Sequence, residues 1–274
     1  MKKVLHLIML LVFIFCGALS ASANPNGGVP RYYTFPPNMS PVETLQYFHH
    51  KITDRDFGMA WDVLTEDYKN FFKSYGSFEK GYATMLTSRP GSLRVIEQTG
   101  DTAKIAYVIH ARDWLDETRI AEQAFECTAV LKMTEGGWLL DSGSGKLIRR
   151  EELDSHRSAA AVLKSYHECI THKEMRTAWN LLGSGYKKSF GDFPAFCNGF
   201  TTTVSSAVSN IVPVADGPNM TALEYTLTAK DSTKETNVVQ VFKGMAEMEV
   251  VPGQGWRIMS ASNKLVDRYF PPKW

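Results

Sequence analysis

The stretch LQYFHHKITDRDFGMAWDVLTEDYKNFFKSYGSFEKGY, residues 45–82, decides the fold because the chain contains it a second time. An offset of 118 positions places it, without a gap, on LKSYHECITHKEMRTAWNLLGSGYKKSFGDFPAFCNGF at residues 163–200. The two stretches share 12 identities in 38 positions, where unrelated stretches share about two at typical residue frequencies. The same offset also matches Gly137-Trp138 with Gly255-Trp256. The chain therefore holds one unit twice, each about 110 residues long, which is a typical length for a small domain.

Each unit begins with helical spacing and ends with alternation. Apolar residues first recur at steps of three and four, the period of amphipathic helices. Ser40-Pro41 supplies a cap and a first-turn proline for the first helix. Asp54 or Asp56 begins the second helix, and a third opens near Ser77 and, in the second unit, near Asp192. Strands are predicted at 93–98, 102–112, 118–133 and 137–148, and at 211–216, 220–230, 236–251 and 255–266. Short connections make these sheets antiparallel, and helices followed by strands indicate an α+β domain.

The Ala-Trp-x-x-Leu segments at 60–64 and 178–182, the aromatic pair at Tyr68 and Phe72, and a long sheet ending in Gly-Trp resemble a known family. They are similar to the nuclear transport factor 2-like superfamily of cystatin-like α+β cones, in the form found as accessory domains of exported bacterial proteins. The resemblance covers residues 41–150 and 159–268. It implies two tandem cone-shaped domains, each with two or three N-terminal helices packed on a curved four-stranded antiparallel sheet. The superfamily includes isomerases, dehydratases, ligand binders and non-catalytic interaction domains, so the fold alone does not decide the function.

The N-terminus predicts export. Lys2 and Lys3 precede an apolar run over 4–15, and Ala21-Ser22-Ala23 provides small residues for a signal peptidase. We expect a signal peptide over 1–23, cleaved after Ala23, with an uncleaved anchor as the alternative. The run is shorter than the roughly 20 apolar residues of a membrane-spanning helix, and no second run of that length follows. We therefore expect an extracytoplasmic protein, periplasmic or secreted, with no transmembrane span after cleavage. Residues 24–40 form a proline-rich segment, and residues 269–274 form a C-terminal tail.

Composition and motifs exclude several classes of function. Lys+Arg 30 balances Asp+Glu 29, and no block of five like charges occurs, so a nucleic-acid partner is not expected. The chain lacks a glycine-rich phosphate loop, a Gly-x-Ser-x-Gly elbow, a His-Glu-x-x-His motif and a paired Cys-x-x-Cys motif. We therefore predict no catalytic residues, no cofactor and no metal site.

Four polar residues are candidates for a ligand pocket: His49, His167, His110 and Asp141. The first two are equivalent and share a helical stripe with the predicted core, so each is either a titratable cavity residue or a buried imidazole bonded to a backbone carbonyl. His110 and Asp141 are aligned with Thr228 and Met259 of the second unit, so a site built on these two residues would exist in the first unit only. The acids near the central hairpins are interpreted as turn residues: Asp113, Glu117, Asp231 and Glu235.

Aromatic residues divide into core and surface groups. Tryptophans at matched positions are predicted to anchor the cores: Trp61, Trp179, Trp138 and Trp256. Four other residues are candidates for contact with a partner, or for packing on the domains themselves: Trp114, Tyr269, Phe270 and Trp274.

Three cysteines remain after signal cleavage. Cys169 and Cys197 replace Lys51 and Glu79 of the first unit, so both cysteines belong to one copy. This predicts a Cys169–Cys197 disulfide in an oxidising compartment, with three buried thiols as the alternative. Cys127 lies within a predicted strand and is interpreted as a core residue.

Together these observations predict an exported, non-enzymatic module of the bacterial cell envelope that binds a small ligand or an envelope protein. Two alternatives stay open. One is an isomerase-type or hydratase-type enzyme that works in the cone cavity. The other is a structural dimerisation protein, with sheets paired inside one chain or between two copies.

Overall fold

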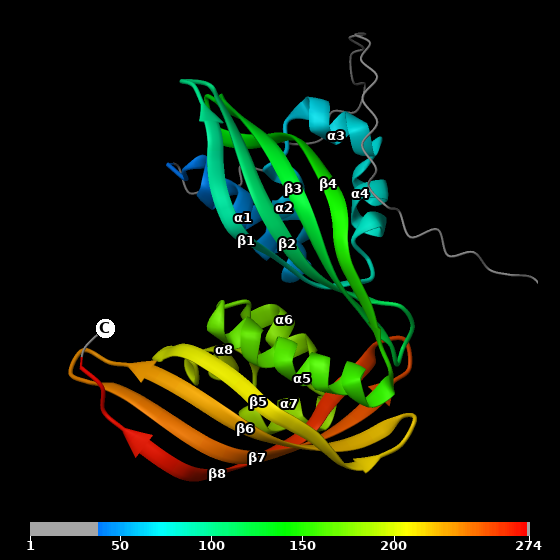
Figure 1. The fold of residues 1–274 in the computed structure, drawn as a ribbon, viewed down its shortest axis with the longest axis vertical. Helices are drawn as coiled ribbons and strands as arrows, with labels where there is room; N and C mark the ends of the chain where they lie inside the picture. The colour runs from blue at the N-terminus through cyan, green and yellow to red at the C-terminus, as the bar shows by residue number, and fades with distance from the viewer. Residues whose placement is uncertain (1–37, 273–274) are drawn as a thin grey trace, which may run out of the picture.

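Each domain consists of four short helices followed by a four-stranded antiparallel sheet (Figure 1). The structure is a computed structural model that describes residues 38–272. The first domain contains α1 (Pro41–Thr53), α2 (Phe57–Asp62), α3 (Glu66–Phe72), α4 (Tyr75–Gly81), β1 (Met85–Gln98), β2 (Thr102–Trp114), β3 (Ile120–Thr134) and β4 (Gly137–Leu153). The second contains α5 (Ser155–Thr171), α6 (Met175–Asn180), α7 (Ser184–Phe190), α8 (Phe193–Asn198), β5 (Thr203–Asp216), β6 (Met220–Ser232), β7 (Asn237–Val251) and β8 (Gly255–Tyr269). The predicted fold class, two tandem α+β domains with helices ahead of each sheet, is confirmed.

The first strand of each sheet is longer than the sequence pattern indicated. β1 and β5 begin at Met85 and Thr203, eight residues ahead of the predicted starts at 93 and 211. In β1, Pro90-Gly91 interrupts the pattern, and the pairing with β2 shifts register between Gly91 and Arg94. Proline is tolerated there because β1 is an edge strand. Each domain also has four helices instead of two or three, because the predicted middle helix divides into shorter ones.

Capping residues fix where the first helix of each domain begins. The Ser40 hydroxyl accepts a bond from the Glu43 amide, and the Glu43 carboxylate accepts one from the Ser40 amide, which makes a capping box at α1. In the second domain Asp154 caps α5 by accepting from the Arg157 amide. Because β4 runs to Leu153, the polar stretch 149–158 is strand, cap and helix rather than a flexible linker.

The cores lie between each sheet and its helices. Parallel bridges join Leu64 to Leu140 in the first domain and Leu182 to Ile258 in the second, so both helical layers meet the last strand in the same way. Of the predicted tryptophan anchors, Trp138 and Trp256 are buried, whereas Trp61 and Trp179 are partly buried. Each of the latter packs against a fully buried phenylalanine at a ring separation of 5.2 Å.

The helices of the second domain lie between the two sheets (Figure 1). Three apolar residues of the first domain, Leu86, Ile120 and Leu153, belong to the core of the second. The two sheets are separate within residues 38–272 and helices of the second domain lie between them, so the alternative of sheets paired inside one chain is wrong, while pairing between two copies stays a prediction. The first sheet instead places its outer face, the one turned away from its own helices, on α5. No helix within residues 38–272 has the length and apolar character needed to cross a membrane.

Candidate functional site

The two matched histidines lie inside the cones and make the same contact. His49 Nδ1 is 2.9 Å from Ser88 Oγ on β1, and His167 Nδ1 is 2.7 Å from Ser206 Oγ on β5. Burial lowers the pKa of both imidazoles to about 3. Both rings are therefore neutral near pH 7 and are hydrogen-bonded to a serine hydroxyl rather than to a backbone carbonyl.

A threonine completes this arrangement in each domain. Thr53 Oγ1 donates to the Ser88 carbonyl and accepts from the Ser88 amide, and Thr171 does the same with Ser206. We call each set of histidine, serine and threonine a His-Ser-Thr triplet. The triplets fasten the first helix of each domain to its first strand, which is a structural role.

Packed side chains occupy the interior of the first cone. The His49 ring lies 5.2 Å from Phe48 and 5.7 Å from Tyr107, measured between ring centroids. Its Nε2 atom is buried without a hydrogen-bond partner. Burial also raises the pKa values of the surrounding phenols well above their ordinary value: Tyr68, Tyr82 and Tyr107. These groups stay neutral and serve as packing residues.

The other two pocket candidates do not join His49. His110 is exposed on β2 and pairs in register with Arg89, whereas His49 contacts the opposite face of the sheet through Ser88. Asp141 lies on β4, beside the start of α3. Its carboxylate accepts hydrogen bonds from Thr65 Oγ1 and from Lys132 Nζ, each at 3.0 Å. No single pocket therefore collects His49, His110 and Asp141.

The interpretation of the hairpin acids as turn residues does not hold for Asp113 and Asp231, which lie within strands β2 and β6. Asp113 accepts a bond of 2.8 Å from Gln123 Nε2, and its equivalent Asp231 accepts one of 2.9 Å from Thr203 Oγ1. Burial raises the pKa of Asp113 to about 6. Glu117 reaches across to the second domain and accepts a bond of 2.6 Å from the Gly253 amide.

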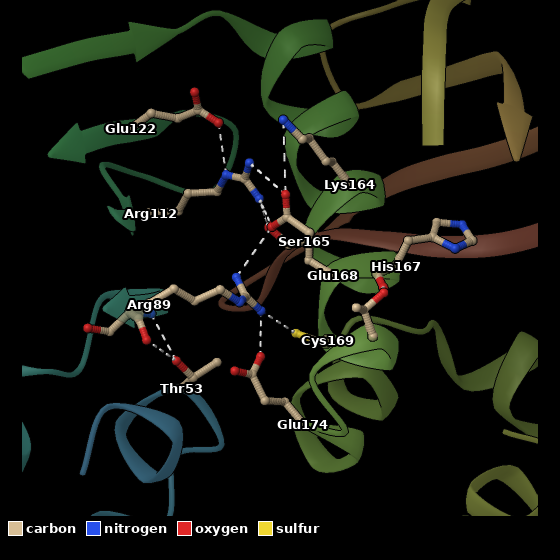
Figure 2. A network of polar contacts seen from close by, with 12 residues as sticks. Thr53, Arg89, Arg112, Glu122, Lys164, Ser165, His167, Glu168, Cys169 and Glu174 are labelled. Atoms are coloured by element: carbon tan, nitrogen blue, oxygen red, sulfur yellow. Dashed lines mark hydrogen bonds and ion pairs between the residues drawn. The ribbon is translucent and has the colours of Figure 1, made fainter. Parts of the chain in front are cut away.

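Two arginines of the first sheet hold the domains together. Arg112 donates from Nη1 to Glu168 at 2.7 Å and to Ser165 at 2.6 Å, both on α5, and from Nε to Glu122 at 2.8 Å. Arg89 donates to Glu168 and to Glu174, whose side chain is only 4% exposed. Figure 2 shows these groups converging between the sheet and α5, with His167 on the same helix pointing away. We call Arg89, Arg112, Ser165, Glu168 and Glu174 the interface network.

The predicted disulfide is absent, because all three described cysteines are free. Cys169 is fully buried on the side of α5 that faces the first domain, where its sulfur accepts a 3.3 Å contact from Arg89 Nη2. It therefore does not face α8, which carries Cys197. Burial raises the pKa of Cys169 well above its ordinary value, so the thiol is not a nucleophile.

A cleft of about 500 Å³ opens where the domains meet, and we call it the interdomain cleft. Its charged lining residues come from both domains: Arg55, Asp116, Glu117, Lys187 and Arg257. Its apolar lining residues are Met85, Leu86, Trp114 and Leu181. The volume lies within the range of about 300–1,000 Å³ that is typical of small-molecule sites.

The partner-contact candidates have different surroundings. Trp114 lines the interdomain cleft, where its ring lies against Gly255 of the second domain, so its contact is within the chain. Tyr269 and Phe270 are 50% and 66% exposed at the end of β8. Trp274 lies outside the described residues, as do the predicted signal peptide 1–23 and most of the proline-rich segment.

Sequence reasoning missed the interface network and the cationic residues of the cleft. One signal was available, because Arg89, Glu168 and Glu174 occupy positions at which the other copy has Ala207, His50 and Asp56. The charges of Arg89 and Glu168, which the other copy lacks, marked the contact between the domains, as Cys169 did, whereas the acid at Glu174 is present in both copies. Among residues 38–272, no group of three or more histidines, cysteines or acids is placed to hold a metal ion.

No family model and no curated protein matches the chain. Among solved structures, a "putative scytalone dehydratase" from Novosphingobium aromaticivorans shares 11% identity at a TM-score of 0.35, covering 42% of this chain and 85% of its own. A "putative aromatic ring hydroxylase" from the same organism shares 15% identity at a TM-score of 0.34, covering 43% and 92%. An "Ntf2 like protein involved in plasmid conjugation" shares 8% identity at a TM-score of 0.26, covering 78% and 97%.

Proposed function

We propose that this protein is an exported, non-enzymatic binding module of the bacterial cell envelope that takes a small ligand in the interdomain cleft. The observation that carries the proposal is the position of the cleft. It lies between two domains joined by a buried ion network, with lining residues from both. Domain junctions are common positions for ligand sites, and a rigid junction holds the lining residues in place without a ligand. Export rests on the signal segment in the sequence.

The observed chemistry supports binding better than it supports catalysis. An isomerase or hydratase inside a cone would need an open cavity and a group that gains or loses a proton near pH 7. The first cone is instead occupied by packed rings, and the imidazoles of both cones have a pKa of about 3. Asp113, whose pKa burial raises to about 6, accepts a hydrogen bond from Gln123. The carboxylates at the cleft, Asp116 and Glu117, are bonded to Arg119 and to the Gly253 amide. These interactions fit a positioning role at the domain contact.

The proposal is tested by native mass spectrometry of the protein purified from the extracytoplasmic fraction of its host, with a denatured sample beside it. We expect a non-covalent small molecule in the native sample and none in the denatured one. The variant Gln254→Trp places a large ring at an exposed turn residue that lines the cleft, and it should abolish retention of the molecule. The matched control is Gly136→Trp, in the corresponding turn of the first domain, which is exposed and outside the cleft. Retention by both variants would place the site elsewhere and overturn the proposal.

A second candidate function, binding of a protein partner, is favoured by one observation. Tyr269 and Phe270 are exposed together at the end of β8. The equivalent positions of the first sheet are Glu151 and Glu152, and the next residue, Leu153, belongs to the core of the second domain. Light scattering of the wild type and of a Tyr269→Ser, Phe270→Ser double variant tests self-association at this end, and a smaller mass for the variant would support it.

A further inference from the structure

Three cations that line the interdomain cleft have no carboxylate partner in the described part of the chain. They are Arg55 of the first domain and Lys187 and Arg257 of the second. No ion pair to a carboxylate is observed for any of them within residues 38–272, although Arg89, Arg112, Arg119 and Arg157 all have one. The contrast sets the cleft apart from the interface network, where every arginine is neutralised.

Arg257 is the most buried of the three cations. Its Nη1 donates to the Trp256 carbonyl at 2.8 Å, and its buried Nε has no hydrogen-bond partner among the described residues. Burial and the nearby charge of Arg55 lower the pKa of Arg257 to about 10. Burying a guanidinium without a counter-ion raises the free energy of the folded state, so an anion bound beside Arg257 would stabilise it.

Lys187 and Arg55 surround the same space. Lys187 on α7 has no anionic partner within residues 38–272, and its ammonium lies 5.6 Å from the Trp179 ring centroid. Burial lowers its pKa, and the charges of Arg257 and Arg176 lower it further. Arg55 donates to the Ala83 and Met85 carbonyls, which fixes its guanidinium at the edge of the first domain.

The acids of the cleft do not neutralise these cations. Asp116 is bonded to Arg119 and to the amide of Thr118, and Glu117 is bonded to the Gly253 amide. Besides burial, nearby cations lower the pKa of both groups: Arg257 and Arg176 act on Lys187, and Arg55 acts on Arg257. Arg55 and Arg257, which come from different domains, therefore lie close to each other in the cleft.

We infer that the interdomain cleft binds an organic anion, with an acidic group on Arg257 and Lys187 and an apolar body against Trp114 and Leu86. The inference rests on the proposed function, because it assigns a ligand class to the same cleft. Carboxylate, sulfonate and phosphate groups share the required chemistry, since each accepts charge-assisted hydrogen bonds from guanidinium and ammonium groups. The volume of about 500 Å³ leaves room for an apolar body beside the acidic group.

A pair of fluorescent probes tests the inference on the purified full chain. 8-Anilinonaphthalene-1-sulfonate carries a sulfonate on an apolar ring system, and N-phenyl-1-naphthylamine has the same rings without the charge. We expect the sulfonate to bind at least tenfold more tightly than the neutral probe. Arg257→Gln and Lys187→Gln should each weaken binding of the sulfonate about tenfold, which is the usual effect of losing a hydrogen bond to a charged group. They should leave the weak binding of the neutral probe unchanged.

The matched control is Lys188→Gln, which removes the same charge from an exposed neighbour on α7 that does not line the cleft. Unchanged sulfonate binding by Lys188→Gln, together with the losses above, supports the inference. One outcome separates the two ideas: Gln254→Trp abolishes binding of both probes, whereas Arg257→Gln and Lys187→Gln change the binding of neither. The cleft then binds ligands without preference for anions, so the inference fails while the proposed function stands. If Gln254→Trp and both charge variants leave binding of both probes intact, both fail.

Discussion

The two domains are alike inside and different where they touch. Inside, each has a His-Ser-Thr triplet, a parallel bridge to the last strand, and a cation with positive φ after its first helix, Arg55 at 61° and Lys173 at 60°. At the surface, Arg89 and Arg112 of the first sheet correspond to Ala207 and Lys230 of the second. Packing retains the internal positions in both copies, whereas the contact between domains uses residues that only one copy has.

The largest effect is expected from breaking the interface network. Arg112→Ala leaves Glu168 and Glu122 without this partner at a position where the arginine side chain is 11% exposed. Removing one member of a buried ion pair typically costs about 3–5 kcal/mol, so we expect a loss of about 3 kcal/mol in the free energy of unfolding. Urea denaturation followed by circular dichroism measures it.

The equivalent substitution in the second domain is the control for that experiment. Lys230→Ala removes a cation at the same place in the alignment, but Lys230 is exposed. We expect a change of within about 0.5 kcal/mol, as for most surface substitutions. Equal losses in the two variants would mean that the network does not couple the domains.

The histidines of the two triplets should respond to acid in the same way. Each has a pKa of about 3 when folded and of about 6.5 when unfolded, so the unfolded chain binds the extra proton. Their contribution to stability is therefore complete above pH 6.5 and is lost as the pH falls toward 3. At pH 4.5 the loss is about 2–3 kcal/mol for each histidine.

His49→Gln and His167→Gln test this equivalence. Each variant should remove about half of the histidine-dependent loss of stability between pH 7.5 and pH 4.5, and the double variant should remove nearly all of it. Urea denaturation at the two pH values is the measurement. A large effect from one histidine and none from the other would show that the triplets differ in function despite their matching geometry.

Substitutions at two equivalent glycines distinguish the cost of backbone strain from the cost of a clash at the domain contact. Gly137 and Gly255 both have positive φ, at 113° and 75°, so alanine is strained at either position. A Cβ at Gly255 would lie 2.7 Å from the Trp114 ring across the interface, whereas at Gly137 it would meet nothing within 4 Å. Gly255→Ala should therefore cost about 1–2 kcal/mol more than Gly137→Ala in thermal denaturation, because an overpacked contact adds to the strain. Equal costs would mean that Trp114 moves aside freely.

Much of the fold could be predicted from sequence because duplication samples each internal position twice. His49 and His167, or Trp138 and Trp256, stood out as matched residues, and the order of helices and strands followed from one change of period. The contact between domains could not be predicted in the same way. Arg89 lies seventy-nine positions from Glu168 along the chain, and no local pattern reports on partners at that distance. The asymmetry at Cys169 was visible, but its cause was misread, because a residue unique to one copy can face the other domain as well as its own.

The smallest expected effect concerns the paired hairpin acids. Burial raises the pKa of Asp113 to about 6 in the folded protein, above its ordinary value of 3.8. A raised pKa means that the folded state favours the neutral acid. The stabilisation that the neutral Asp113 gives to the folded state is therefore complete below pH 3.8 and is lost as the pH rises through 6. Asparagine is always neutral and can still accept the bond from Gln123. Asp113→Asn should therefore raise the free energy of unfolding by about 1 kcal/mol at pH 7.5 and leave it unchanged at pH 3.5.

Asp231→Asn provides the comparison in the second domain. The Asp231 carboxylate accepts bonds from the hydroxyl groups of Thr202 and Thr203. Losing that charge weakens both bonds, so at pH 7.5 this variant should be slightly less stable than the wild type. Opposite signs at two equivalent positions, measured by urea denaturation, would show that the environment of the hairpin acid changed between the copies while the fold did not. The same sign in both variants would mean that desolvation does not govern Asp113.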